Sequence, residues 1–140
     1  PMSRSEVNII YDAETAFRAP GLAAVTATAA IGTVALDKLV NVRPSSQRNK
    51  LGAQSYKIAI VVEALDTVST DETYVFSAQV GATGAAATQV AELTVSETGQ
   101  YVLMIDAQSI EKADADYEEI ELNLTVGGTT PSITFSAWLV

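Results

Sequence analysis

The 140-residue sequence contains no cysteine and no histidine. Without thiols the chain can form neither disulfides nor zinc-thiolate sites, and it has no cysteine nucleophile. Without imidazole it cannot use a histidine-dependent acid-base mechanism. Carboxylates are therefore the candidates for catalysis.

Aromatic residues and long apolar runs are also scarce. Aromatic side chains make up 6% of the sequence, and no apolar run approaches the roughly 18 residues that a membrane-spanning helix needs. Residues 1–4 lack the apolar core of a signal peptide, so we expect a soluble protein with no membrane partner. Abundant alanine and threonine favour a single domain of closely packed β structure over a binding pocket walled by rings.

Positive charge is nearly absent from the second half of the sequence. Residues 1–57 carry seven basic and four acidic side chains, whereas residues 58–140 carry thirteen acids and one base, Lys112. The net charge of −9 has the wrong sign for phosphate contacts, so we expect no nucleic-acid partner. The acidic half is either a solvated surface or a face that pairs with the basic region of another copy or of a partner.

Two apolar runs at the end of the sequence alternate with period two. Residues 119–126 place apolar side chains at every second position, and residues 133–140 repeat this pattern. The intervening Gly127 to Pro131 segment is a turn signal, because glycine permits positive φ and proline removes a ladder donor. The pattern predicts neighbouring antiparallel strands on which the rest of the domain assembles.

The rest of the sequence also predicts short strands. Turn signals recur every eight to twelve residues, and no helical period lasts for about a dozen residues. The nearly continuous apolar run at 56–65 predicts a central strand covered on both sides, and residues 21–39 predict two short strands. About eight strands in one layer would leave long edges, so we predict an all-β fold of two stacked antiparallel sheets.

Two polar segments lie outside this pattern. Residues 1–20 predict an extended N-terminal arm, with a short helical turn near Asp12, before a single sandwich domain at 21–140. We expect the side chain of Phe17 in this arm to be buried against apolar residues, either of its own domain or of a neighbouring molecule. Residues 41–54 predict one long loop whose Arg43, Arg48 and Lys50 suit an acidic partner surface.

The carboxylates do not form a recognisable catalytic or metal-binding motif. Paired acids can act as acid and base when burial separates their pKa values, but the candidates lie in or beside an acidic turn. These candidates are Asp114, Asp116, Glu118 and Glu121. Calcium could be bound by two sets of carboxylates, Asp114 with Asp116, or Asp66 with Asp71 and Glu72. Neither set has the residue spacing of an EF-hand loop. We therefore expect no enzyme activity, no cofactor and no metal.

Two further segments have structural interpretations. Residues 81–87 are glycine and other small residues but lack the Lys-Ser/Thr ending and the following helix of a phosphate-binding loop, so they predict a flexible turn. Trp138 alternates onto the polar side of the last strand, where tryptophan is typical of a sheet or interface anchor. We consider both a subunit contact and ordinary intramolecular packing for Trp138.

Both ends of the sequence resemble one known family. VTATA at 25–29, VALD at 34–37, ELNLTVGGTTP at 121–131 and SAWLV at 136–140 are similar to segments of small capsid cement proteins of tailed phages, of the Bordetella-phage type. The resemblance implies a jelly-roll-like β-sandwich that forms homotrimers on the outer surface of an icosahedral head and bridges neighbouring major capsid proteins. The chain departs from the family pattern in its longer N-terminal arm and in the loop from Arg43 to Lys50.

The resemblance leads to a hypothesis of a virion structural protein with seven contact residues. Capsid docking is assigned to the arm and the basic loop, and Trp138 to a subunit contact: Arg4, Phe17, Arg18, Arg43, Arg48, Lys50 and Trp138. The alternative is a carbohydrate-binding jelly roll for host attachment, which needs exposed aromatic side chains. Its candidates are Tyr74, Tyr101, Tyr117 and Trp138.

Overall fold

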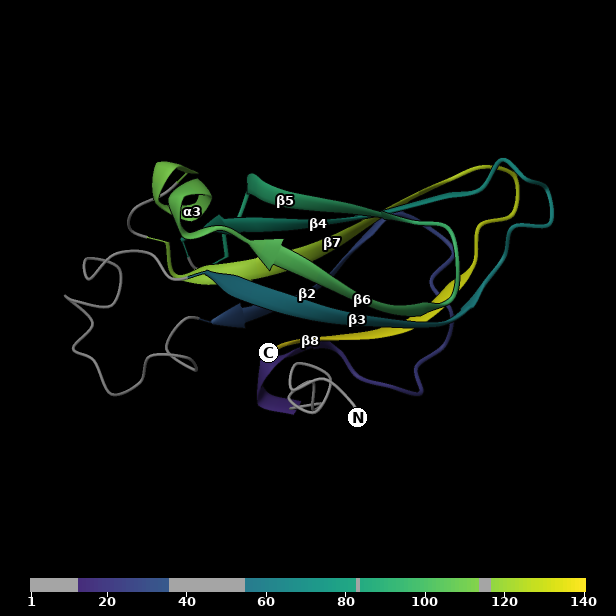
Figure 1. Ribbon diagram of the computed structural model, residues 1–140, viewed down its shortest axis with the longest axis horizontal. Helices are drawn as coiled ribbons and strands as arrows, with labels where there is room; N and C mark the ends of the chain where they lie inside the picture. Colours follow the sequence, from purple (N-terminus) through teal and green to yellow (C-terminus); the bar gives the residue numbers. More distant parts are fainter. Residues whose placement is uncertain (1–12, 36–54, 83, 114–116) are drawn as a thin grey trace, which may run out of the picture.

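The computed structural model describes residues 13–35, 55–82, 84–113 and 117–140 (Figure 1). A 3-10 turn, η1 (Ala13–Thr15), and a short helix, α3 (Ala107–Ala113), accompany eight strands. The strands are β1 (Ala16–Arg18), β2 (Ala29–Ala35), β3 (Tyr56–Leu65), β4 (Thr73–Gly81), β5 (Thr88–Val95), β6 (Gly99–Ile105), β7 (Glu119–Gly127) and β8 (Ile133–Leu139).

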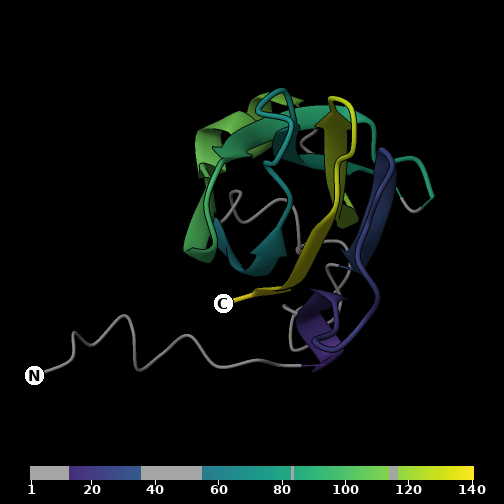
Figure 2. The same cartoon turned by 90° about the vertical axis from the view of Figure 1, so that its right-hand side faces the viewer.

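The eight strands form two antiparallel sheets that pack face to face (Figures 1 and 2). Sheet A has the order β1-β8-β3-β6, and sheet B has the order β2-β7-β4-β5. Among the described strands, only β4 and β5 are consecutive in the sequence and neighbours within one sheet, so the other pairs of consecutive strands lie in different sheets. The predicted all-β sandwich of about eight antiparallel strands is thus confirmed.

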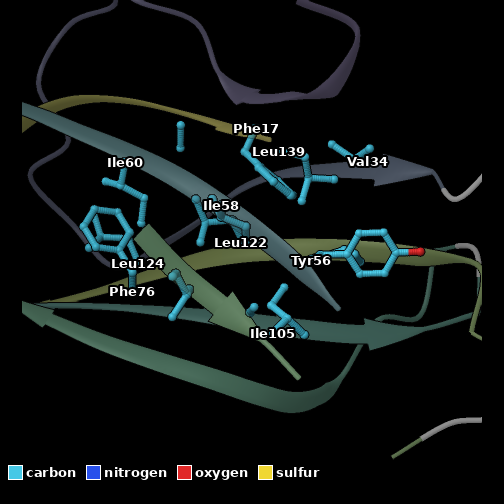
Figure 3. Packing of buried hydrophobic residues seen from close by; sticks show 14 of the residues in the cluster. Phe17, Val34, Tyr56, Ile58, Ile60, Phe76, Ile105, Leu122, Leu124 and Leu139 are labelled. Atoms are coloured by element: carbon cyan, nitrogen blue, oxygen red, sulfur yellow. The ribbon is translucent and has the colours of Figure 1, made fainter. Parts of the chain in front are cut away.

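The core fills the space between the two sheets. Ile58 and Ile60 of β3 face Leu122 and Leu124 of β7, as period-two alternation requires (Figure 3). Phe76 of β4 and Phe135 of β8 meet edge to face, with ring centroids 4.9 Å apart and planes at 75°. Such an aromatic pair adds about 0.5–1.5 kcal/mol beyond its area burial and ties the two sheets together.

The strand predicted at 56–65 is central, as expected, because β3 lies between β8 and β6 in sheet A. Its outward side is not covered throughout, since Lys57 and Glu63 are exposed. The prediction that both sides are covered is therefore wrong for this strand. The apolar run is continuous because two of the outward-facing residues of β3, Ala59 and Val61, are also apolar.

The prediction that the last two strands are neighbours is wrong. β7 pairs with β2 and β4 in sheet B, whereas β8 pairs with β1 and β3 in sheet A. The loop between them therefore crosses from one sheet to the other instead of closing a hairpin. Alternation specifies which side chains are buried but does not specify which strand supplies the backbone partners.

The end of the predicted N-terminal arm belongs to the sandwich. Residues 16–18 form β1 on the edge of sheet A, and Phe17 is 5% exposed within the chain's own core. Of the two alternatives for Phe17, its own domain is therefore the one observed, not a neighbouring molecule. Because β1 belongs to sheet A, the sandwich begins before residue 20. Residues 1–12 lie outside the described part of the chain.

Residues 15–25 close the outer edge of β8. β1 pairs with the C-terminal part of β8, where Ala16 lies opposite Trp138. Further groups bond to β8 along the same edge: the backbone of Val25 to Ile133, Arg18 Nε to the Phe135 carbonyl and Thr15 Oγ1 to the Leu139 carbonyl. A closed edge leaves no template for unwanted strand pairing.

Two local predictions differ from the structure. Two strands were predicted for residues 21–39; the described part of this segment, 21–35, contains one bridge at Val25 and one strand, β2. Helix α3 was missed because it is only seven residues long. Asp106 precedes it, its Oδ2 accepts from Ser109 N at 3.3 Å, and Ile110 anchors the helix in the core. This aspartate followed by helix-favouring residues was the available signal.

β1 and β2 approach each other closely at Gly32. A β-carbon at this position would lie 2.4 Å from the carbonyl oxygen of Phe17. Because the obstacle is backbone, a side-chain rotation cannot relieve the clash. Gly32 thus permits close contact between β1 and β2, which are the edge strands of the two sheets.

Gly32→Ala is therefore expected to destabilise the protein, because one of the two edge strands must shift. We expect a loss of about 1–3 kcal/mol in the free energy of unfolding, measured by urea denaturation. The control is Thr33→Ala, which truncates the exposed neighbouring residue and is expected to change stability by no more than about 0.5 kcal/mol. Equal midpoints for Gly32→Ala and the unmodified protein would contradict the close approach of β1 and β2.

Candidate interaction surface

The outer face of sheet A carries an apolar patch. In the described residues, three of the exposed large hydrophobic side chains lie on it: Met104 at 60% exposure, Val140 at 48% and Val102 at 40%. Strand register places Val102 beside Ala59, which in turn lies beside Trp138. We call the surface formed by Val61, Val102, Met104, Trp138 and Val140 the outer patch.

One cation lies within the outer patch. Lys57 is exposed and pairs in register with Met104, and its carbonyl accepts from Val140 N at 2.9 Å. The row Met104, Lys57, Val140 therefore runs across the sheet next to the row of Val102, Ala59 and Trp138. A group of exposed apolar side chains on one face is typical of an interaction site, and Lys57 adds a single cation to it.

The outer face of sheet B has the opposite character. Glu92 and Thr94 of β5 are exposed on it, and β7 contributes the half-buried Glu121 and Asn123. The amide of Asn123 donates to Glu121 Oε1 at 3.1 Å, and Gln89 donates to Glu92 at 3.2 Å. This face is polar and acidic, so the two sides of the sandwich present different surfaces to solvent or to partners.

Of the seven predicted contact residues, the structure describes three. Phe17 lies in the core, so the prediction that it contacts a partner is wrong for its side chain. Arg18 is half-buried, with its guanidinium 5.1 Å from the Phe135 ring centre and bonded to the carbonyls of Phe135 and Ala23. Trp138 lies in the outer patch but is 6% exposed. Arg4, Arg43, Arg48 and Lys50 lie outside the described residues.

The sequence analysis missed Val102 and Met104 as surface residues. In β6, Leu103 and Ile105 are buried and alternate with Val102 and Met104. The overlooked signal is that the other side of the same strand is also apolar, although β6 lies at the edge of its sheet. A strand that is apolar on both sides and is covered on only one leaves an exposed patch.

The candidate carboxylates do not assemble into a metal site in the described part of the chain, where no group of three or more potential ligands is found. Asp114 and Asp116 lie outside that part, Glu118 is exposed and Glu121 bonds to Asn123. Glu119 is buried, and its Oε1 accepts from Gly84 N at 3.0 Å, which holds the β4–β5 loop.

Asp71 and Glu72 have a structural role at the end of the sandwich opposite α3 (Figure 1). Asp71 Oδ1 accepts from Thr129 N at 3.1 Å and its Oδ2 from Thr129 Oγ1 at 2.7 Å. Glu72 Oε2 accepts from the amide and the hydroxyl of Thr130, both at 3.3 Å. These four bonds, which we call the loop clasp, join the β3–β4 loop to the β7–β8 loop.

Tyr74 connects the same two loops as the loop clasp. Its hydroxyl donates to the Asp66 carbonyl at 2.6 Å and accepts from Ser132 N at 2.9 Å. The hydroxyl and the amide of Thr129 lower the pKa of Asp71 below its ordinary value of 3.8, because they stabilise the carboxylate. The two sheet-crossing loops are therefore fixed to each other by charge-assisted hydrogen bonds.

The aromatic residues named for carbohydrate binding are mostly unavailable. Tyr74 and Tyr117 lie in the core, and Tyr56 and Tyr117 place their hydroxyl groups 3.2 Å apart. Tyr101 is partly buried and donates to the Glu97 carbonyl at 2.7 Å. Together with the burial of Trp138, this means that none of the four candidates is an exposed stacking platform.

Comparison with known proteins adds no relatives. No family model matches the sequence, and neither a curated protein nor a solved structure is significantly similar to it. None of the helices in the described residues combines the length and the apolar character that a membrane crossing requires. The site must therefore be interpreted from its own geometry.

The loop clasp predicts a specific pH dependence. Because the pKa of Asp71 is lowered in the folded state, its contribution to stability is present above pH 3.8 and is lost as the pH falls through the folded-state pKa. We expect Asp71→Asn to be less stable than the unmodified protein at neutral pH, with a difference that shrinks below pH 3.8. Urea denaturation across pH 2–7 measures this difference.

The control for loss of one surface charge is Glu63→Gln, which removes an exposed carboxylate on β3. A stability difference for Asp71→Asn that stays constant from neutral pH to the acid limit would show that the carboxylate charge does not strengthen the loop clasp.

Proposed function

We propose that this protein is a capsid cement, or decoration, protein: a non-catalytic virion component that assembles as a homotrimer on the outer surface of an icosahedral phage head. In this role it bridges neighbouring major capsid proteins. The observation that carries the proposal is the outer patch, an apolar surface on one side of a sandwich whose other side is polar and acidic. The resemblance of both ends of the sequence to phage cement proteins supports the same role.

The strand order supports a jelly-roll assignment. A jelly roll winds eight strands into two four-stranded sheets by repeated crossings between the layers. The order β1-β8-β3-β6 over β2-β7-β4-β5, with one connection inside a sheet, fits this winding. Fold alone does not specify function, and the outer patch is the feature that supports binding.

The two faces suggest an orientation in the assembly. An apolar surface gains free energy when a protein neighbour removes it from water, whereas a face with Glu92 and Glu121 retains hydration. In the proposed arrangement sheet A faces the subunit or coat neighbours, and sheet B faces solvent. Arg4, Arg18, Arg43, Arg48 and Lys50 supply positive charge for an acidic rim on the coat protein, although Arg18 also bonds internally.

The mass of the purified protein tests self-association. We expect light scattering to give three times the chain mass of 14.7 kDa. Val102→Glu is expected to weaken association by at least about tenfold in Kd, because it buries an unpaired charge in the outer patch. Thr94→Glu, an exposed outward position on the β5 edge strand of sheet B, is the matched control and is expected to leave the mass unchanged.

The basic loop tests capsid docking. Replacing Arg43, Arg48 and Lys50 by serine is expected to weaken binding to phage heads most strongly at low salt, because exposed charge pairs are screened as ionic strength rises. Lys112→Ser, which removes the exposed base on α3, is the control. Unchanged head binding of the triple variant at every salt concentration would overturn the docking assignment.

The alternative of a carbohydrate-binding module has no supporting observation in the described residues, since its four aromatic candidates are buried or partly buried. A glycan array with and without a chelator distinguishes this alternative from the cement role.

A further inference from the structure

The exposed large hydrophobic side chains of the described chain fall into two groups. Met104, Val102 and Val140 lie in the outer patch. Leu22 and Val68 lie in the β1–β2 and β3–β4 loops, and Val68 has the highest exposure of the five at 87%. Met104 lies at the end of sheet A near α3, whereas the β3–β4 loop lies at the opposite end (Figure 1).

The β3–β4 loop presents Val68 on an ordered backbone. Asp66 Oδ1 accepts from Val68 N at 2.9 Å, and Thr70 N donates to the Thr67 carbonyl at 3.1 Å. Thr70 has a φ of 62°, a left-handed conformation that is uncommon for a β-branched residue. The loop clasp and Tyr74 hold the base of this loop. A pre-ordered tip loses little conformational entropy when it binds.

The charges of the tip and of the outer patch are complementary. The β3–β4 loop carries Asp66 and Asp71 on either side of Val68, and the sequence contains no base between Lys57 and Lys112. The outer patch contains Lys57 between Met104 and Val140. A protruding apolar residue with acidic neighbours therefore matches a flat apolar surface that contains a cation.

Threefold assembly requires such a pair of unlike surfaces. In a cyclic trimer each interface is heterologous, so one surface of a copy meets a different surface of the next. We infer that the tip of the β3–β4 loop of one copy, with Val68 at its apex, docks on the outer patch around Met104 and Lys57 of the next copy. This inference rests on the proposed homotrimer and specifies which two surfaces form its interface.

A charge exchange tests the contact. Val68→Lys places a cation against Lys57, and Met104→Glu places a carboxylate against the acidic tip. We expect each single variant to raise the Kd for self-association at least about tenfold, and the combination Val68→Lys with Met104→Glu to recover most of this loss. Light scattering over a concentration series gives the Kd, and circular dichroism with urea denaturation verifies folding. Thr94→Lys on sheet B is the charge control.

The outcomes separate this inference from the proposed function. If the unmodified protein is a trimer and Val68→Lys leaves its Kd unchanged, the tip is not the mate of the outer patch, and the proposed trimer stands. If both single variants weaken association but the combination shows no recovery, the two residues do not meet. If the unmodified protein has the mass of one chain throughout the series, the homotrimer and this inference fail together.

Discussion

The packing of sheet A against sheet B is the interaction on which the rest of the structure depends. Because nearly every connection crosses between the sheets, the position of each strand is defined only when both layers are in place. Phe76 and Phe135 meet edge to face across this interface. Burial of the apolar side chains between the layers supplies the main stabilisation, and the backbone ladders within each sheet satisfy the polar groups.

One edge of β8 and one end of the sandwich are closed by specific contacts. Arg18 and its neighbours bond along the outer edge of β8, and Gly32 permits the close approach of β1 and β2. At the far end, Asp71 and Glu72 join two loops that cross between the sheets. Phe17 and Arg18, which were predicted to contact a partner, therefore make most of their contacts within their own chain.

The surfaces left over are unequal, and this inequality is the basis of the proposed role. Sheet A presents Met104 and Val102 to its surroundings, whereas sheet B presents Glu92 and Glu121. A domain that had only to remain soluble would gain nothing from an apolar outer face. A protein that binds neighbours on one side and faces water on the other needs this division, and the exposed Val68 in the β3–β4 loop provides a second, unlike surface.

The sequence by itself determined the all-β class, the positions of most strands and which side of each strand is apolar, because these follow from period-two alternation and from turn residues. Only the tertiary structure decided that β7 and β8 lie in different sheets, that Phe17 is core and that Val102 and Met104 face outward. The physical reason is that strand pairing and coverage depend on residues distant in the sequence, whereas alternation is a local property of each strand.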